Sequence, residues 1–486
     1  MDMGNTQQVK TGEINIGDLR VVPIIISFVV AGFIGLFSET ALNMALTNLI
    51  GDFGIHETTA QWLTTGYLLT LGVLVPVSGL IMQWFTTRQL FITSLIASII
   101  GTFIAAIAPT FAILMVARVV QAIGTALLLP LMFNTMLLII PPHRRGRIMG
   151  VIGLVIMFAP AVGPTISGII INNLTWHWIF WFSLPLLIGA LIFGLFFMQN
   201  VAVPTKPRID ILSILLSTLG FGGIVYGFSS AGEGGGWGSP TVIIAIFVGV
   251  ISLVLFSIRQ TKMEKPMLDL RAFKYPMFTI GLLLILVCMM VMLSTMILLP
   301  LYLQTSLALT TFAAGLLLLP GGIINGILSP VMGGLFDKFG PKWLVKIGIV
   351  ILAGAMFGFS TITMETSSGF IIGLHIVTMV GISMIMMPAQ TNGLNQLPRE
   401  LYPDGTAIMN TLQQVAGAIG TAIAISIMSS GQESFMTSVE DPANPVNQLL
   451  AFTAGVQDAF IFAIIMAIIG FVISLFVKRV KVEHQM

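Results

Sequence analysis

The sequence predicts an all-α polytopic membrane protein with fourteen transmembrane helices and both termini in the cytoplasm. Three observations predict this fold class. The 486-residue chain is 56% hydrophobic and only 8% charged, whereas soluble domains contain about 25% charged residues. Fourteen apolar stretches are long enough to cross a hydrocarbon core about 30 Å thick. Nearly all lysines and arginines lie on one side of these stretches.

The composition also excludes several classes of protein. Too few charges are present to cover a water-soluble surface, which excludes soluble enzymes, nucleic-acid-binding proteins and disordered proteins. The single cysteine, Cys288, excludes an internal disulfide and a thiolate metal cluster. The first 20 residues are polar and the apolar stretch after them is too long for a signal-peptide core, so no cleavable signal peptide is predicted. We therefore expect no cofactor and no nucleic-acid partner.

The predicted spans follow one another with short connections. In chain order they are 22–49, 62–82, 89–108, 111–140, 148–171, 177–198, 211–230, 241–258, 277–302, 312–335, 343–363, 369–394, 405–430 and 459–477. Breaks between them include the Pro-Pro-His-Arg-Arg run from Pro141, the glycine-rich run 232–238 and the charged link 259–274. The longest polar connection is 431–457, where an apolar middle suggests partial order. We expect it to be an extracellular loop.

The distribution of positive charge supports this topology, because cytoplasmic loops are rich in Lys and Arg. With the N-terminus inside, 20 of the 21 Lys and Arg residues are cytoplasmic, and the exception is Arg118. The opposite loops contain acidic residues and no basic one. An odd error in the number of spans would destroy this sorting. An even error, such as twelve helices instead of fourteen, would leave the sorting intact. The charges therefore establish that the number of spans is even and how the chain is oriented, but not the number itself.

Two similar segments suggest an internal repeat. Residues 76–88 read PVSGLIMQWFTTR, and residues 330–342 read PVMGGLFDKFGPK. Pro76 and Gly79 match Pro330 and Gly333 at a constant offset, and both copies end a span on the cytoplasmic side. A partial match by chance is the alternative in so biased a composition. If the repeat is real, the chain consists of two like-oriented halves, as in one large class of secondary transporters.

Two charged residues stand out within the predicted spans, because a charge at the bilayer centre costs at least about 2.5–3.5 kcal/mol and is by default a functional candidate. Glu39 lies midway along the first span, with Asn43 one turn later. Arg118 lies in the fourth span, with Gln121 on or beside its face. A lone buried carboxyl that is exposed alternately to either side of the membrane can bind and release a proton. The structural alternatives are a hydrogen-bonding role for Glu39 and snorkelling for Arg118.

The fifth span is unusually rich in glycine and proline. Residues 153–168 read GLVIMFAPAVGPTISG. Small residues allow close helix contact in lipid, and proline bends a helix. The residues concerned are Gly153, Pro160, Gly163, Pro164 and Gly168.

With these motifs, the chain resembles the major facilitator superfamily, and within it the 14-helix drug:proton antiporters of the EmrB/QacA type, in the lincomycin-resistance-like branch. The resemblance covers about residues 20–480. Arg118, Gln121 and Gly124 match the family's fourth-helix motif, whose arginine is associated with proton coupling. The glycines and prolines of the fifth span match the antiporter motif, which is specific for export.

The resemblance implies a major facilitator fold of two six-helix bundles plus two inserted helices. The implied domains are a cytoplasmic segment 1–20, an N-terminal bundle 21–200, inserted helices and a link 201–275, a C-terminal bundle 276–480 and a cytoplasmic tail 481–486.

Two departures from the family pattern bear on function. The loop after the second helix has Gln83 and Thr86 where the family has Asp and Gly. In the first helix, the family often has an acid where Ser38 stands, and Glu39 is turned from it by about 100°. The second-half loop keeps the pattern, so the predicted cytoplasmic gate comprises Asp337, Lys338, Gly340 and Lys342 together with Gln83 and Arg88.

The leading interpretation is proton-driven efflux of amphipathic drugs, often cationic or neutral, by alternating access. The expected partners are small-molecule drugs, protons and the lipid bilayer of the bacterial plasma membrane, with the protein acting as a monomer. No phosphate-binding loop is present, so ATP is not needed. Candidate substrate-lining residues are Asn43, Trp62, Tyr67, Gln121, Asn134, Asn325, Asn410 and Gln413. For each, hydrogen bonding between helices is an equal alternative.

Two other functions are weighed against this one. The first keeps the fold but exports a lipid, a siderophore or an amino acid, with drug transport incidental. The second is a membrane-embedded enzyme, which the five scattered histidines do not favour.

Overall fold

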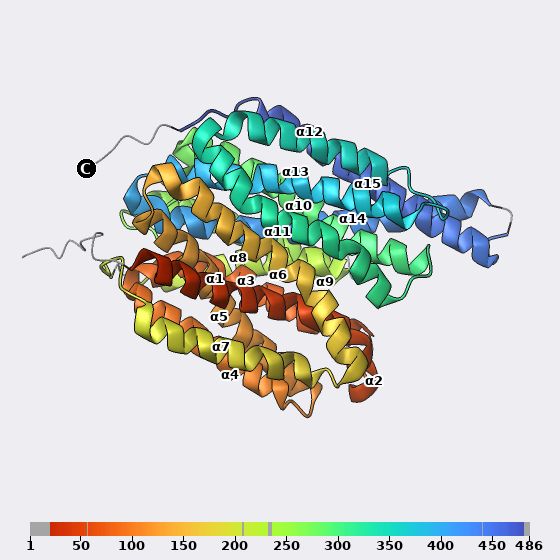
Figure 1. Cartoon of the computed structure of the whole chain (residues 1–486), viewed down its shortest axis with the longest axis horizontal. Coiled ribbons are helices and arrows are strands. Elements are labelled where there is room, and N and C mark those ends of the chain that lie inside the picture. Colours follow the sequence, from red (N-terminus) through yellow and green to blue (C-terminus); the bar gives the residue numbers. More distant parts are fainter. Residues whose placement is uncertain (1–19, 56, 207–208, 232–235, 440, 481–486) are drawn as a thin grey trace, which may run out of the picture.

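The computed structural model describes residues 20–55, 57–206, 209–231, 236–439 and 441–480. This part of the chain contains helices and no strand, and the long helices run roughly side by side along one axis (Figure 1). Fourteen of them are long and apolar enough to cross a membrane. The number favoured from the sequence is therefore confirmed over twelve. The start of α1 and the end of α15 lie at the same end of the molecule, as the predicted orientation requires (Figure 1).

The first half of the chain forms one group of helices. They are α1 (Val21–Ala41), α2 (Leu46–Phe53), α3 (Glu57–Trp84), α4 (Thr87–Ala106), α5 (Phe111–Ile139), α6 (Arg145–Asn173) and α7 (His177–Phe197). The first predicted span, 22–49, is not one continuous helix, because a 3-10 segment, Leu42–Ala45, separates α1 from the short α2.

The remaining helices are the inserted pair and the second half. They are α8 (Ile211–Ser230), α9 (Pro240–Lys262), α10 (Pro276–Thr305), α11 (Thr311–Phe339), α12 (Pro341–Phe359), α13 (Ser368–Asn395), α14 (Tyr402–Ser438) and α15 (Pro445–Ser474). The pair α8–α9 packs together and lies beside α3 and α14. Asp210, just before α8, binds Arg259 of α9 at 2.6 Å. The hydrogen bond from Arg259 lowers the pKa of Asp210 to about 2, so this pair is ionised at physiological pH.

The prediction of a long loop at 431–457 is wrong. α14 continues to Ser438, and α15 already begins at Pro445. Hydropathy detects only the part of a helix that lies in lipid, and these polar turns extend beyond that part. The two helices hold each other in place by a close contact, since a Cβ added at Gly455 would lie 2.1 Å from the Met428 carbonyl oxygen. The Asn444 side chain caps α15 by accepting a hydrogen bond from the Val446 backbone N–H at 2.9 Å.

Burial separates central helices from peripheral ones. Within the most apolar window of each helix, 67% of α10 is buried but only 22% of α9. Large apolar side chains such as Phe247 remain exposed on α9, on a surface suited to lipid. The two halves meet where α6 packs along α11 and α3 packs along α14. Figure 1 shows α4 and α7 along one edge of the molecule and α12 along the other.

Candidate functional site

Arg118 of α5 is completely buried, with 0% of its surface exposed. Its Nη1 donates to the Ser38 carbonyl oxygen of α1 at 3.0 Å, and its Nε donates to the Leu63 carbonyl oxygen of α3 at 3.4 Å. Its guanidinium carbon lies 4.3 Å from the centroid of the Tyr67 ring, within the range of a cation–π interaction. The guanidinium thus joins three helices of the first half. Snorkelling to the membrane surface is inconsistent with this burial.

Gln121 extends the same hydrogen-bond network. Its Oε1 accepts a hydrogen bond from Arg118 at 3.1 Å, and its Nε2 donates to Thr102 Oγ1 of α4 at 2.9 Å and to Ser38 Oγ at 3.4 Å. Tyr67, also in contact with Arg118, shares a hydrogen bond of 2.8 Å between its hydroxyl and Thr125 Oγ1. These bonds fix the orientation of the polar groups around the arginine. Two predicted substrate-lining residues, Tyr67 and Gln121, therefore belong to this network.

Glu39 lies on α1 directly after Ser38, whose carbonyl oxygen binds Arg118. The side chains of Glu39 and Asn43 fall outside the described part of the structure. The backbone alone brings the Glu39 segment next to the buried guanidinium. A pairing of these two residues in proton transfer stays a prediction.

Two glycines of the predicted antiporter motif, Gly153 and Gly163 on α6, lie at close helix contacts. A Cβ added at Gly163 would lie 2.3 Å from Thr40 Oγ1, one residue from Glu39. A Cβ at Gly153 would lie 2.7 Å from the Met387 side chain of α13. Pro160 and Gly168 lie on the same helix, both half-buried, while the side chain of Pro164 is not described. The motif thus places α6 in contact with α1 of its own half and with the second half.

Toward the cytoplasm, α6 and α11 approach even more closely. A Cβ at Gly333 would lie 1.9 Å from the Gly146 carbonyl oxygen, and one at Gly150 would lie 2.4 Å from the Ser329 carbonyl oxygen. No side chain fits between the two backbones there. The repeat residue Gly333 is therefore part of the contact between the halves.

Asp337 ties the second half to the first at the end of this contact. Its Oδ1 accepts a hydrogen bond from the Gly146 backbone N–H at 2.8 Å, and its Oδ2 accepts one from Arg147 at 2.9 Å. A carboxylate at a helix N-terminus is stabilised by the free N–H groups and the helix dipole. Arg479, near the C-terminus, donates to the carbonyl oxygens of Asp337 at 2.7 Å and of Lys338 at 3.2 Å. We call this arrangement the α11–α6 latch.

The other predicted gating residues have different surroundings. Gly340 ends α11 with a φ of +78°, a conformation that favours glycine, and Lys342 is exposed. The Gln83 carbonyl oxygen accepts hydrogen bonds from the backbone N–H groups of residues 205 and 206 at 2.9 and 3.1 Å. Arg88 Nη2 donates to the Leu195 carbonyl oxygen within the first half at 2.7 Å. These bonds of Gln83 and Arg88 do not reach the second half.

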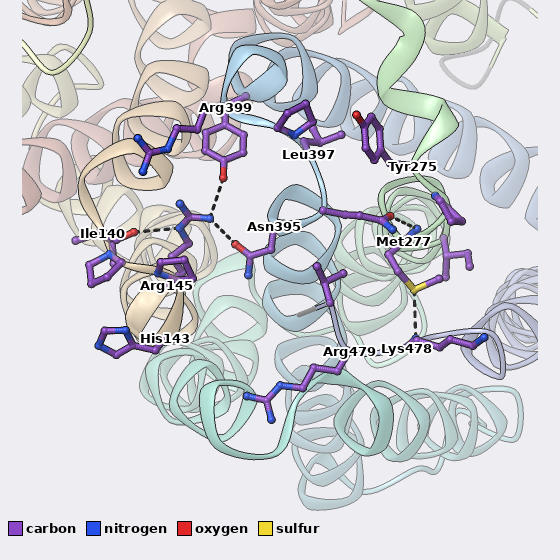
Figure 2. Close-up of a pocket in the computed structure, with 18 of the residues that line it drawn as sticks. Ile140, His143, Arg145, Tyr275, Met277, Asn395, Leu397, Arg399, Lys478 and Arg479 are labelled. Carbon is purple, nitrogen blue, oxygen red and sulfur yellow. Dashed lines mark hydrogen bonds between the residues drawn. The ribbon is translucent and has the colours of Figure 1, made fainter. Parts of the chain in front are cut away.

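Arg145 is a second tie between the halves, and sequence reasoning did not single it out. Its Nη1 donates to Asn395 Oδ1 of α13 at 2.8 Å and to the Tyr402 hydroxyl of α14 at 3.1 Å (Figure 2). Its Nε and Nη2 donate to the carbonyl oxygens of Ile140 and Leu137. In the sequence it is one of several cytoplasmic arginines. Its burial depends on helices about 250 residues apart.

A cavity of about 1290 Å³ opens beside Arg145 at the cytoplasmic end of the molecule. Figure 2 shows Tyr275, Asn395, Arg399, Lys478 and Arg479 around it. The predicted substrate-lining residues are not part of its lining. It is therefore a cytoplasmic vestibule between the two halves.

The remaining substrate candidates have varied environments. Asn325 is fully buried and accepts a hydrogen bond from Ser329, and Asn410 Nδ2 donates to the Thr406 carbonyl oxygen at 2.8 Å. Trp62 is 38% exposed and packs 5.7 Å from the Tyr226 ring of the inserted helix α8. Asn134 Oδ1 and Gln413 Nε2 are buried without a hydrogen-bond partner among the described residues. These last two side chains have the capacity to bind a ligand.

Comparison with known proteins agrees with this architecture. The sequence profile of the Major Facilitator Superfamily matches residues 28–421. The chain is 66% identical over 466 residues to the lincomycin resistance protein LmrB of Bacillus subtilis (strain 168), covering 96% of this chain and 97% of that protein. It is 26% identical over 451 residues to the multidrug export protein EmrB of Haemophilus influenzae, covering 92% of this chain and 88% of that protein.

Solved structures share the fold at low sequence identity. The human organic anion transporter MFSD10 (TETRAN) superposes with a TM-score of 0.66 at 13% identity, covering 94% of this chain and 99% of that one. The proton:xylose symporter XylE gives a TM-score of 0.64 at 15% identity, covering 95% and 96%. Because the profile matches most of the chain and a relative is 66% identical along almost its whole length, the chain belongs to the major facilitator superfamily.

Proposed function

We propose that the chain is a proton-driven exporter of amphipathic drugs in the bacterial plasma membrane, acting as a monomer by alternating access. Membership in a family of transporters and the similarity to proteins named for lincomycin resistance and multidrug export support this function. The observation that carries the proton coupling is the buried Arg118, bonded to the carbonyl oxygen directly before Glu39. We include lincomycin among the substrates on the similarity to LmrB.

The mechanism assigns the proton to Glu39 and the control of its affinity to Arg118. A nearby cation favours the ionised carboxylate, and removal of water favours the protonated one. Movement of α1 relative to α5 changes both, so the proton binds when the site faces outside and leaves when it faces the cytoplasm. One inward proton supplies about 2.3 kcal/mol per 100 mV of membrane potential, plus about 1.4 kcal/mol per pH unit.

Substrate binding in this proposal uses polar groups that the helices leave unpaired. Asn134 and Gln413 come from α5 and α14, one in each half, and both are buried. A substrate that hydrogen-bonds both residues would couple the halves during the transition. The vestibule beside Arg145 then becomes the cytoplasmic entrance when the α11–α6 latch opens.

The test is transport by the purified protein in proteoliposomes under an imposed pH gradient, with lincomycin and a chemically broad panel of drugs. Glu39→Gln keeps the shape of the side chain but cannot carry a proton, so we expect uphill export to stop while the protein remains folded. Asp441→Asn, an exposed acid on the extracellular side, is the control and should transport normally. Uphill export by Glu39→Gln would show that Glu39 is not the proton carrier.

A further inference from the structure

Asp404, in the first turn of α14, is a buried acid that the proposed mechanism does not use. Only 4% of its surface is exposed, and its Oδ1 has no hydrogen-bond partner among the described residues. An ionised carboxylate that is removed from water without a partner is strongly disfavoured compared with its protonated form. The position thus needs either a cation or a proton.

The charged neighbours of Asp404 do not provide a cation of its own. On the link before α10, Asp269 is 6% exposed and lies close to the Asp404 carboxyl. Arg271 is engaged by Asp269 at 2.9 Å and its side chain is 67% exposed. Two buried carboxyl groups therefore share one largely solvated guanidinium.

The other helices around this turn present no charge to it in the described structure. From α10 and the end of α13, the neighbours of the adjacent Gly405 are Phe278, Leu394 and Leu397. From α3 of the first half, the neighbour is Gly79, and a Cβ placed there would lie 3.7 Å from Asp404 Oδ1. The unpartnered oxygen thus faces the other half of the molecule across the α3–α14 contact.

The internal repeat shows that Asp404 lies at an interface whose counterpart in the other half has its acid on the opposite helix. At the second-half copy, Gly333 packs on α6 and Asp337 reaches the N-terminus of α6. At the first-half copy, Gly79 packs on the start of α14, but Gln83 stands where the acid would be. The acid at this interface is instead Asp404, on α14 itself. One interface thus contains a carboxylate bound by N–H donors, and the other contains a carboxyl group facing a glycine.

We propose that Asp404 is a proton-binding residue of the cytoplasmic gate. It is protonated while α3 and α14 enclose it, and its O–H bond breaks when they separate, with the proton passing to cytoplasmic water and the electron pair staying on the carboxylate. Opening toward the cytoplasm therefore releases a proton there, and an alkaline cytoplasm favours opening. This inference deepens the proposed function and rests on its alternating access, but not on the role of Glu39.

The test measures the gate directly, without substrate or gradient. Spin labels are attached to cysteines introduced at Phe85, just after α3, and Arg399, just before α14, both exposed positions. Cys288 is 1% exposed and stays unlabelled. Distance distributions of the full chain carrying Glu39→Gln, which removes the other proposed proton-binding residue, are recorded in lipid nanodiscs across a pH series. We expect the open-to-closed ratio to rise with pH by up to about tenfold per pH unit, the limit for one linked proton.

Asp404→Asn mimics the protonated side chain and should remove this rise, leaving the mouth closed. Glu400→Gln, at an exposed acid four residues earlier, is the matched control in the same Glu39→Gln chain and should leave the slope unchanged. Asp337, half-buried at the same mouth, is tested separately: Asp337→Asn should still show the rise with pH. An unchanged slope in Asp404→Asn overturns the proposal.

A second variant and a second measurement keep the proposal testable if Asp404→Asn does not fold. If Asp404→Asn does not fold, Asp404→Ser provides the neutral side chain. Infrared difference spectra of the Glu39→Gln chain should show a protonated carboxyl band that disappears on opening, and the same band in the Glu39→Gln chain that also carries the Asp404 substitution would overturn the proposal. The transport assay with Glu39→Gln is independent of both readings. Failure of the proposed coupling at Glu39 is therefore distinguishable from failure at Asp404.

Discussion

At the scale of single residues, Arg118 shows how the fold holds a charge inside the membrane. Its donors are directed at two main-chain carbonyl oxygens and one side-chain amide, and an aromatic ring covers its guanidinium. A hydrogen bond from a charged group contributes about 1.5–3 kcal/mol, which offsets part of the cost of burying the cation. Protein groups thus replace water around Nε and Nη1 of the guanidinium, and a guanidinium remains protonated in proteins.

Arg118→Lys is therefore not a conservative change. The ammonium group is a single point charge and cannot reach α1, α3 and Gln121 together, whereas the planar guanidinium does. Loss of one charged hydrogen bond predicts a fall in transport rate of roughly tenfold or more. The measurement is initial export rate in proteoliposomes at equal amounts of folded protein. Arg147→Lys serves as control because its side chain is exposed, and wild-type rates in Arg118→Lys would contradict the assignment.

The sequence identified Arg118 and placed Gln121 beside it, but it did not identify the partners of Arg118 on α1 and α3. A lone arginine in an apolar span is conspicuous, because a charge in that position is costly. Its partners Ser38 and Leu63 use their carbonyl oxygens, which every residue has, so no side-chain pattern could reveal them. Arg145 was not identified from the sequence, because an arginine in a cytoplasmic loop is common. It resembles other basic loop residues until α13 and α14 bury it.

At the scale of helices, α6 and α11 form the closest contact between the halves through glycine. Lipid supplies no hydrophobic drive between apolar helices, so association depends on van der Waals packing and on small residues that let backbones approach. The sequence showed the glycine-rich segment 153–168 and the repeat on α11, but not that Gly333 of the repeat meets Gly146, which precedes that segment. Helix ends were less predictable, because the polar final turns of α14 carry no hydropathy signal.

Gly333→Ala tests this contact. Its new methyl group would meet the Gly146 carbonyl oxygen at 1.9 Å, so the cytoplasmic ends of α6 and α11 must separate. We expect the closed state to lose population and the export rate to fall by about tenfold, as for other overpacked contacts. Gly334→Ala is the control, since a Cβ there has no neighbour within 4 Å, and it should stay within about twofold of wild type. Equal rates in the two variants would rule out a gate formed by this contact.

At the scale of the whole molecule, the two halves are held together at their cytoplasmic ends by polar ties of different kinds. The α11–α6 latch uses a carboxylate on a helix N-terminus, and Arg145 uses a guanidinium on an amide and a phenol. Each of these groups can bind water instead once the mouth opens. The ties therefore set the balance between states without fixing the protein in one of them.

Asp337→Asn should shift this balance toward the cytoplasm-open state. The amide keeps one acceptor oxygen but turns an NH2 group toward a backbone N–H of α6, and it removes the charge that the helix N-terminus stabilises. Loss of one charged hydrogen bond of about 1.5–3 kcal/mol predicts roughly a tenfold or larger rise in the open-to-closed ratio.

Paired spin labels on cysteines introduced at Arg144 and Phe339, exposed positions at the start of α6 and the end of α11, would measure this ratio. Glu365→Gln, at an exposed acid on the extracellular side, should leave the distances unchanged. The helical content of Asp337→Asn should equal that of the wild type, because the latch joins the halves and does not build either one. A distance distribution identical to the wild type would mean that the Gly333 contact and Arg145 close the mouth without the carboxylate.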